Sequence, residues 1–238
     1  MRSARAHGCA LILLFVTAST SCRVSTEPVI NSNTSPETIV STTPPFQTRE
    51  PERYQATRTI TIFTPKGETI VTRTLIARDG PLRREESETV VYLELAEGRF
   101  VLVPSQQVYA AATAEDAIPS EDDESSPDRL LHTDAISASY QLLGSENIGG
   151  RNAKKYRVVV NSSATENVTQ SETIMWIDET LTMPVKSETK SAGGTRTVME
   201  LSNIVLAAES QLFQIPANFQ KIAFRDLWKQ RRSSRLNP

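Results

Sequence analysis

The sequence predicts a mainly β (α+β) protein built around one curled antiparallel sheet of about nine to eleven strands with a short helical cover. Three observations predict this class. β-branched runs alternate with a period of two, short turns rich in Gly or Pro separate them, and one segment shows helical spacing. Short links favour antiparallel pairing, because parallel neighbours need long crossovers. A sheet with that many twisted strands tends to curl.

The first 21 residues are expected to be a signal peptide. Basic residues begin the chain, and residues 9–18 form an apolar run that is too short to cross about 30 Å of hydrocarbon as a helix. Small residues then precede Cys22, which resembles the lipobox at which a lipoprotein signal peptidase cleaves and a lipid is attached to the cysteine sulfur. Ser19 stands where that motif usually has Leu. The alternative is ordinary signal-peptidase cleavage after Ala18.

Residues 22–52 are expected to be the lipidated cysteine and a disordered Ser/Thr/Pro tether. This stretch has no apolar period, and such a composition buries too little surface to fold. Both cysteines, Cys9 and Cys22, lie at the start of the chain, so the mature domain holds no internal disulfide. The lipid anchor predicts a bacterial cell envelope protein that faces the periplasm. Arg23 is not the Asp that retains enteric lipoproteins at the inner membrane, which favours the outer membrane.

The folded domain is expected over residues 53–222. It begins with a β-hairpin of residues 54–64 and 69–77, because both runs alternate β-branched residues around a turn with Pro and Gly. Further strands are expected over residues 88–95 and 99–103.

An acidic surface loop is expected over residues 114–128, which carry a net charge of −7 and two prolines. Calcium binding is the alternative, although the stretch lacks the alternating spacing and the turn glycine of a calcium loop. A helix is expected to follow, with Pro127 in its first turn and Leu142 at its end. This helix is interpreted as a cover on the sheet.

β character returns in the second half of the domain. Strands are expected over residues 141–148, 153–160, 172–178, 183–190 and 195–206. Glycine turns, at Gly149-Gly150 and at residues 192–194, separate the first two and the last two of these strands.

A succession of short motifs marks the carboxy-terminal half. They are Gly149-Gly150 with Tyr156, Met175-Trp176-Ile177-Asp178, Pro184-Val185-Lys186, Glu200-Leu201-Ser202-Asn203-Ile204, and Leu212-Phe213-Gln214-Ile215-Pro216 with Phe219. This order resembles the periplasmic lipoprotein-sorting (LolA/LolB-like) superfamily, in its uncharacterised outer-membrane lipoprotein-like branch. The resemblance implies an unclosed antiparallel half-barrel with helices over its concave face. It also implies an apolar cavity beneath them for lipid or lipoprotein acyl chains.

The resemblance suggests which side chains to examine. The candidates for the cavity or the core are Phe63, Tyr156, Trp176, Phe213, Ile215 and Phe219. Trp176 is more simply a core filler, and Asp178 is expected to cap the turn after its strand. The chain departs from the carriers in two respects. A Pro/Ser/Thr tether runs almost up to Tyr54, where the carriers have a helix before their first strand. Cys22 would also hold the chain on a membrane. A stationary receptor, lipid-holding module or regulator fits better than a shuttle.

The carboxy-terminal residues 223–238 form a basic tail, and residues 221–238 carry a net charge of +5. Bases interleave with apolar residues, as in helices that touch anionic lipid. The candidates for membrane contact are Trp228, Lys229, Arg231 and Arg232. The alternative is that residues 219–227 pack on the sheet and the remainder frays. Nucleic-acid binding does not fit an exported protein.

No catalytic residue, metal site or cofactor is predicted. The mature chain has one histidine, His132, and lacks a Gly-x-Ser-x-Gly motif, a His/Cys cluster and a phosphate-binding loop. The expected function is that of a membrane-anchored envelope lipoprotein that binds lipid or lipoprotein acyl chains. The alternative is an envelope stress, regulatory or protein-interaction module without lipid cargo, whose protein partner the sequence does not identify.

Overall fold

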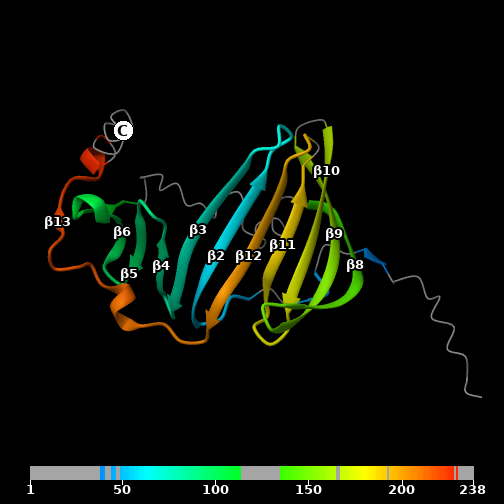
Figure 1. Cartoon of the computed structure of the whole chain (residues 1–238), viewed down its shortest axis with the longest axis horizontal. Helices are drawn as coiled ribbons and strands as arrows, with labels where there is room; N and C mark the ends of the chain where they lie inside the picture. Colours follow the sequence, from blue (N-terminus) through cyan, green and yellow to red (C-terminus); the bar gives the residue numbers. More distant parts are fainter. Residues whose placement is uncertain are drawn as a thin grey trace, which may run out of the picture. The chain divides into compact units, whose positions relative to one another are not determined.

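The structure is a computed structural model that describes residues 38–40, 44–46, 49–113, 135–164, 167–191, 193–227 and 229. These residues form one sheet of thirteen strands in the order β1-β8-β9-β10-β11-β12-β2-β3-β4-β5-β6-β7-β13 (Figure 1). Strands β1 to β12 pair antiparallel, and β13 joins β7 in parallel. The two end strands do not pair with each other, so the predicted open antiparallel sheet is confirmed, with more strands than expected.

The strands from β2 to β7 form one meander. Their bounds are β2 Arg53–Phe63, β3 Thr69–Asp79, β4 Leu82–Glu86, β5 Val91–Leu95, β6 Gly98–Val103 and β7 Val108–Ala112, with a 3-10 turn η1 at Pro104–Gln106. The predicted hairpin is confirmed, because β2 and β3 pair along their whole length from Arg53↔Asp79 to Phe63↔Thr69. The short, charged β4 and the small-residue β7 were not predicted.

The strands from β8 to β12 form a second meander. Their bounds are β8 Ala135–Ile148, β9 Arg151–Ala164, β10 Asn167–Asp178, β11 Met183–Lys190 and β12 Arg196–Val205. The predicted turn at Gly149-Gly150 is confirmed. Both glycines have positive φ, and the Asn147 side-chain oxygen accepts a hydrogen bond of 3.0 Å from the Gly150 N–H. Antiparallel pairing of β12 with β2 joins the two meanders.

The predicted helix ending at Leu142 is wrong over its described part, because residues from Ala135 onward belong to β8. Its first residues lie outside the described chain. The error came from Ala and Leu, which are good helix formers at near-helical spacing. Ala138 and Tyr140 also alternate with serines, and pairing with β9 in the sheet overrode the helical propensity. Short 3-10 turns and residues 224–227 supply the helix in the part of the chain that the structure describes.

Two pieces of the expected tether contact the sheet. Strand β1 (Thr38–Val40) pairs with Ser139–Gln141 at the outer edge of β8. Phe46 packs against buried residues of β8 and β9. The segment before residue 53 therefore contributes to the domain.

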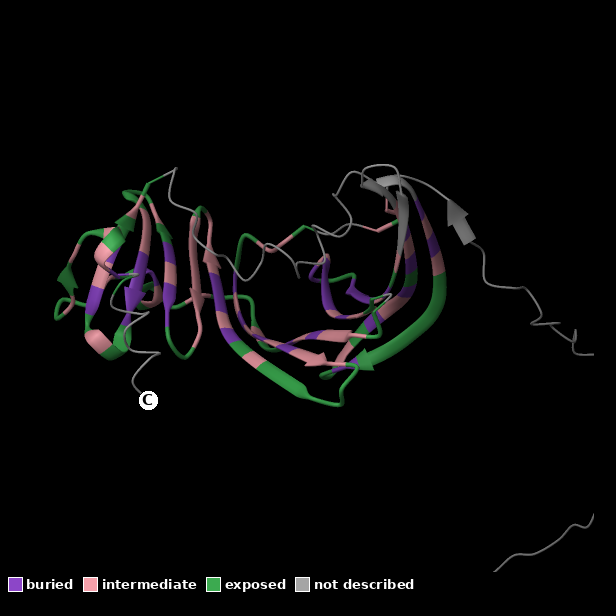
Figure 2. Cartoon of the chain, turned by 90° about the horizontal axis from the view of Figure 1, so that it is seen from above, coloured by how far each residue is buried: buried purple, intermediate pink, exposed green. Residues whose placement is uncertain are grey.

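The register gives the sheet two faces of different character. Tyr156, Met175, Ser187, Met199 and Ile60 are successive register partners across β9, β10, β11, β12 and β2, and all five are buried. Paired residues point to the same side, so we call this side the apolar face. Their neighbours Lys155, Trp176, Lys186, Glu200 and Thr59 point the other way and define the charged face. In Figure 2 the sheet curves over the neighbouring strands β8, β9, β10, β11, β12, β2 and β3.

The carboxy-terminal segment wraps the far edge of the sheet. After the 3-10 turn η2 (Ser210–Phe213), Ile215 and Phe219 pack on Val91, Leu93 and Leu102. Strand β13 (Gln220–Lys221) then pairs with β7, and Leu227 is buried among Val101, Val103 and Ala110 on the opposite face. The β5–β7 end of the sheet is thus covered on both faces by one segment.

Candidate functional site

A cleft of about 450 Å³ lies on the apolar face near the ends of β9 and β10. Its lining residues are Pro44, Pro45, Phe46, Lys154, Tyr156, Ile177, Glu179 and Thr182. The sheet provides Tyr156 and Ile177, and the turn after β10 provides Glu179 and Thr182. The segment Pro44–Phe46 forms the remaining wall, so the cleft lies between the sheet and a piece of chain far from it in sequence.

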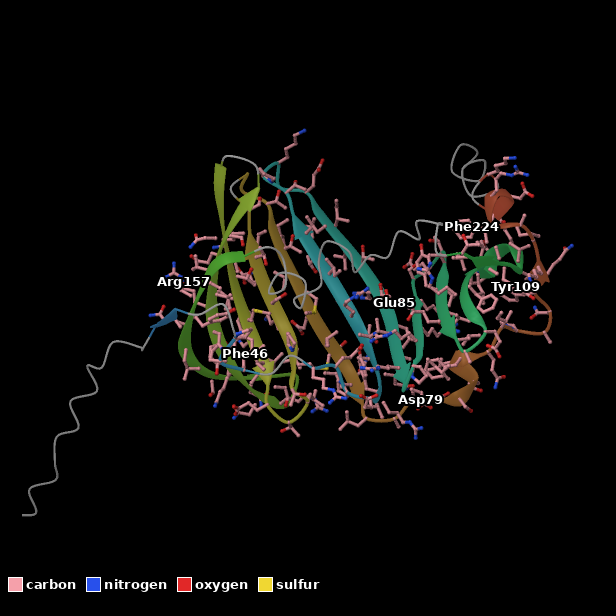
Figure 3. All side chains as sticks on the ribbon, turned by 180° about the vertical axis from the view of Figure 1, so that it is seen from behind. Phe46, Asp79, Glu85, Tyr109, Arg157 and Phe224 are labelled. Carbon is pink, nitrogen blue, oxygen red and sulfur yellow. The ribbon has the colours of Figure 1, made fainter. Side chains whose placement is uncertain are left out.

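Phe46 is the centre of the aromatic packing beside the cleft. Figure 3 labels Phe46. Its ring centroid lies 4.6 Å from that of Tyr156 and 5.8 Å from that of Tyr140, with an edge-on angle of 86° to Tyr140. Such aromatic pairs add about 0.5–1.5 kcal/mol beyond the burial of apolar area. Burial also raises the pKa of the Tyr140 hydroxyl, which therefore stays neutral near pH 7. The ring cluster is an uncharged, largely apolar surface.

Residues 49–54 fix the start of β2 beside this cleft. The Tyr54 hydroxyl donates to Glu50 Oε1, while Arg78 Nη1 and Arg83 Nη2 lie 3.2 Å and 2.7 Å from Glu50 Oε2. The Thr182 hydroxyl donates to the Arg49 carbonyl oxygen at 3.0 Å. These contacts hold the chain immediately after the cleft wall against β3, β4 and the β10–β11 turn.

Charged groups stand at the rim of the cleft. Lys154 Nζ lies 2.6 Å from Glu179 Oε1, and both side chains are partly exposed. The Glu179 carboxylate accepts a hydrogen bond from Lys154 and raises the pKa of that amine. The rim of the cleft therefore carries one ion pair beside its apolar base.

The predicted cavity candidates are distributed over several parts of the sheet. Tyr156 lines the cleft, whereas Trp176 and Phe63 lie on the charged face. The Trp176 indole N–H donates to Glu146 Oε2 at 2.9 Å, and Lys155 Nζ lies 4.8 Å from the ring centroid. The Arg196 guanidinium covers the Phe63 ring at 4.8 Å. Trp176 is therefore a core filler beneath charged side chains, in line with its simpler interpretation.

The remaining candidates belong to the β5–β7 end. Phe213 is buried, and Ile215 and Phe219 pack on β5 and β6. The Leu212 carbonyl oxygen accepts a hydrogen bond of 2.8 Å from Arg84 Nη1, which fixes this segment to β4. These three side chains pack the sheet and do not line the cleft.

The turn cap predicted at Asp178 is confirmed. Its Oδ1 accepts hydrogen bonds from the N–H groups of Thr180 at 2.8 Å and Leu181 at 3.1 Å. Its Oδ2 lies 3.3 Å from Arg151 Nη1. This cap sets the β10–β11 turn, which carries Glu179 and Thr182 to the cleft.

Several predicted features lie outside the described residues. They are Cys22, His132, Trp228, Arg231, Arg232 and residues 114–128. Of the membrane-contact candidates the structure describes Lys229, which is exposed and lies 3.6 Å from Asp226. Ile222, Phe224 and Leu227 pack against the sheet, so these apolar residues of the tail are used within the fold.

Sequence reasoning missed Phe46 and Tyr140. Phe46 stood in a segment interpreted as tether, and Tyr140 in a segment interpreted as helix. The period of two through Ala138, Tyr140 and Leu142 and the aromatic residue after Pro44-Pro45 were the available signals.

Neither a metal cluster nor a membrane-spanning helix is present in the described part of the chain. No group of three His, Cys, Asp or Glu side chains gathers there to hold a metal ion. No helix within the same residues is long and apolar enough to cross a membrane.

Comparison with known proteins gives matches among solved structures. No family model matches the chain, and no curated protein matches it. A LolA superfamily protein from Nitrosomonas europaea aligns at 13% identity over 71% of this chain and 92% of that one, with a TM-score of 0.32. A putative outer membrane lipoprotein-sorting protein domain from Vibrio parahaemolyticus aligns at 11% identity over 68% and 89%, with a TM-score of 0.30.

MucB in the MucA/MucB complex of Pseudomonas aeruginosa aligns at 16% identity over 71% of this chain and 58% of that one, with a TM-score of 0.34. Among solved structures, the chain is similar at low identity to LolA superfamily and lipoprotein-sorting proteins.

Proposed function

We propose that this chain is an envelope lipoprotein, anchored through a lipid on Cys22, that binds acyl chains in the cleft between Pro44–Phe46 and the apolar face. The observation that carries the proposal is the cleft itself. It has a volume of about 450 Å³, within the range of roughly 300–1,000 Å³ of small-molecule sites. Its aromatic and aliphatic base offers apolar contact, and Lys154 stands at its rim.

The proposed anchor is separated from the first strand of the domain by a short stretch of chain. The chain from Cys22 to Thr38, where β1 begins, spans at most about 55 Å when fully extended. A domain held on so short an arm would remain near one membrane surface in the periplasm. A stationary lipid-holding module or receptor therefore fits this chain better than a carrier that travels between membranes.

Acyl binding is tested with the full chain carrying Cys22→Ser, which removes the proposed lipidation and changes no described residue. After delipidation, a fluorescent sixteen-carbon fatty acid is expected to bind saturably with one site per chain. The absence of saturable uptake would reject acyl binding in the cleft as the resting protein presents it.

The matched lysines of β9 localise the binding. Lys154 lies at the rim of the cleft, whereas Lys155 lies on the charged face beside Trp176. We expect Lys154→Ala to weaken binding of the anionic fatty acid by about two- to fivefold, the scale of a partly exposed charge pair. Lys155→Ala is expected to leave it unchanged. An equal effect of both substitutions would place the fatty acid elsewhere.

The anchor has its own test. Mass spectrometry of the chain produced in a bacterium is expected to show a mature form that begins at Cys22 and carries lipid, and Cys22→Ser is expected to lack it. An unmodified form cleaved after Ala18 would reject the lipid anchor and indicate a secreted protein. That result would leave the proposal about the cleft untouched.

A protein-interaction role is the second candidate, and one observation favours it. Strand β1 covers only Ser139–Gln141 of β8, and the adjacent Leu142 and Leu143 are exposed at that edge. An edge strand with exposed apolar residues can accept an extended segment of a partner protein. Crosslinking from position 143 in cells is expected to recover one specific protein if this role holds, and copurified lipid would then be scarce.

A further inference from the structure

We propose that Pro44–Phe46, the wall of the cleft in the resting protein, is displaced when an acyl chain binds, so that the acyl chain packs on the aromatic surface that Phe46 covers. The inference rests on the proposed acyl binding and adds how access to the cleft is controlled. In the structure this segment lines the cleft with all three of its residues, and Phe46 lies against Tyr140 and Tyr156.

Phe46 occupies the surface that an apolar ligand would use. The cluster around it consists of buried residues of β8, β9 and β10, which are Ala138, Tyr140, Tyr156, Val158, Val160, Met175 and Ile177. Phe46 is the partly buried side chain that completes this cluster and comes from outside the sheet. An acyl chain that packs on Tyr156 and Tyr140 must therefore take the place of the Phe46 ring.

The attachment of the segment is suited to displacement. Pro44 and Pro45 have no N–H, so they cannot donate to a strand ladder, and Phe46 contacts the sheet through its ring. On one side of it, β1 is held by pairing with β8. On the other side, Arg49 and Glu50 are held by Thr182, Tyr54, Arg78 and Arg83. Both sets of contacts lie outside the segment itself, so its displacement breaks neither of them.

The size of the effect follows from the aromatic contacts. A ligand that displaces Phe46 must break contacts whose strength is that of one or two aromatic pairs, and one such pair corresponds to about tenfold in affinity. Removing the ring removes this competition. We therefore expect Phe46→Ala to bind the fluorescent sixteen-carbon fatty acid about tenfold more tightly than the unsubstituted protein, both in the Cys22→Ser background.

The sign of the change is decisive. A fixed wall that packs against the ligand would give weaker or equal binding in Phe46→Ala, and that result would overturn the inference. Phe100→Ala is the matched control, because Phe100 is also a partly buried phenylalanine but packs on the β5–β7 cluster. It is expected to leave the affinity unchanged.

A second measurement follows the segment itself. Phe46→Trp labelled with 5-fluorotryptophan adds a third ¹⁹F resonance to those of Trp176 and Trp228. Titration with unlabelled palmitate is expected to move the position-46 resonance to the value of a solvent-exposed indole. The Trp176 resonance is expected to stay, because Trp176 lies on the charged face.

The two proposals fail in different ways. Saturable binding together with an unmoved position-46 resonance would keep acyl binding and reject displacement. Absence of binding in both the unsubstituted protein and Phe46→Ala would reject both. Tight binding seen only in Phe46→Ala would support displacement and show that the segment closes the cleft in the resting protein.

Discussion

At the scale of single residues, the Glu50 carboxylate fixes the start of β2, because it binds three side chains at once. Tyr54, Arg78 and Arg83 all contact it, and Tyr54 is only 2% exposed. Glu50→Gln removes the charge that these donors share. Because hydrogen bonds to charged groups contribute about 1.5–3 kcal/mol, we expect a loss of that size in the free energy of unfolding measured in urea. Glu52→Gln, at an exposed carboxylate in the same segment, is the control and is expected to have no measurable effect.

The same cluster predicts a pH dependence. Burial, and then the charge of Glu50, raise the pKa of Tyr54 above its ordinary value of about 10. Below pH 10 the hydroxyl is protonated in both states, whereas above pH 10 only the unfolded state loses its proton. Stability therefore falls as pH rises, by about 1.4 kcal/mol between pH 9 and pH 11 for this one group. Urea unfolding of Tyr54→Phe at both pH values is expected to show a fall smaller by that amount, and an identical fall would contradict the raised pKa.

At the scale of elements, the carboxy-terminal segment depends on Leu227. Its side chain is fully buried between β5, β6 and β7, at the point where the segment reaches the second face of the sheet. We expect Leu227→Ala to lower the free energy of unfolding by about 2–5 kcal/mol, the usual range for a buried leucine. Leu206→Ala removes the same atoms from a side chain that is 55% exposed, and is expected to change stability by less than about 0.5 kcal/mol. Similar losses in both variants would mean that the segment does not close this end of the sheet.

The elements that could be predicted from the sequence are those formed by residues close to one another in the chain. The hairpin of β2 and β3, the turn at Gly149-Gly150 and the cap at Asp178 were predictable, because their residues are close in sequence. Strand β1 was not, since its three residues are ordered by an edge about one hundred residues away. Tyr156 was recognised from a motif. The local signal at Phe46 is an aromatic residue after Pro44-Pro45, and it does not by itself separate a cleft wall from a tether.

At the scale of the molecule, the pairing of β12 with β2 makes one sheet out of two meanders. Met199 and Ile60 face each other across this junction on the apolar face, and both are buried. The buried cluster that contains them has members on β2, β3, β8, β9, β10, β11 and β12, so it includes strands of both meanders. Loss of packing at the junction therefore weakens both halves, in contrast to a defect confined to one hairpin.

Hydrogen exchange can measure this coupling. Met199→Ala leaves a cavity at the junction, and a buried methionine lost in this way costs about 2–5 kcal/mol. If the meanders open together, the slowest amides of β5 and β6 and those of β9 and β10 lose protection by the same factor, because both exchange through one global opening. Ile70→Ala, at the exposed end of β3, is the control and is expected to leave these amides unchanged. Loss of protection in β9 and β10 alone would show that the β2–β7 meander, with its carboxy-terminal wrap, is stable without the junction.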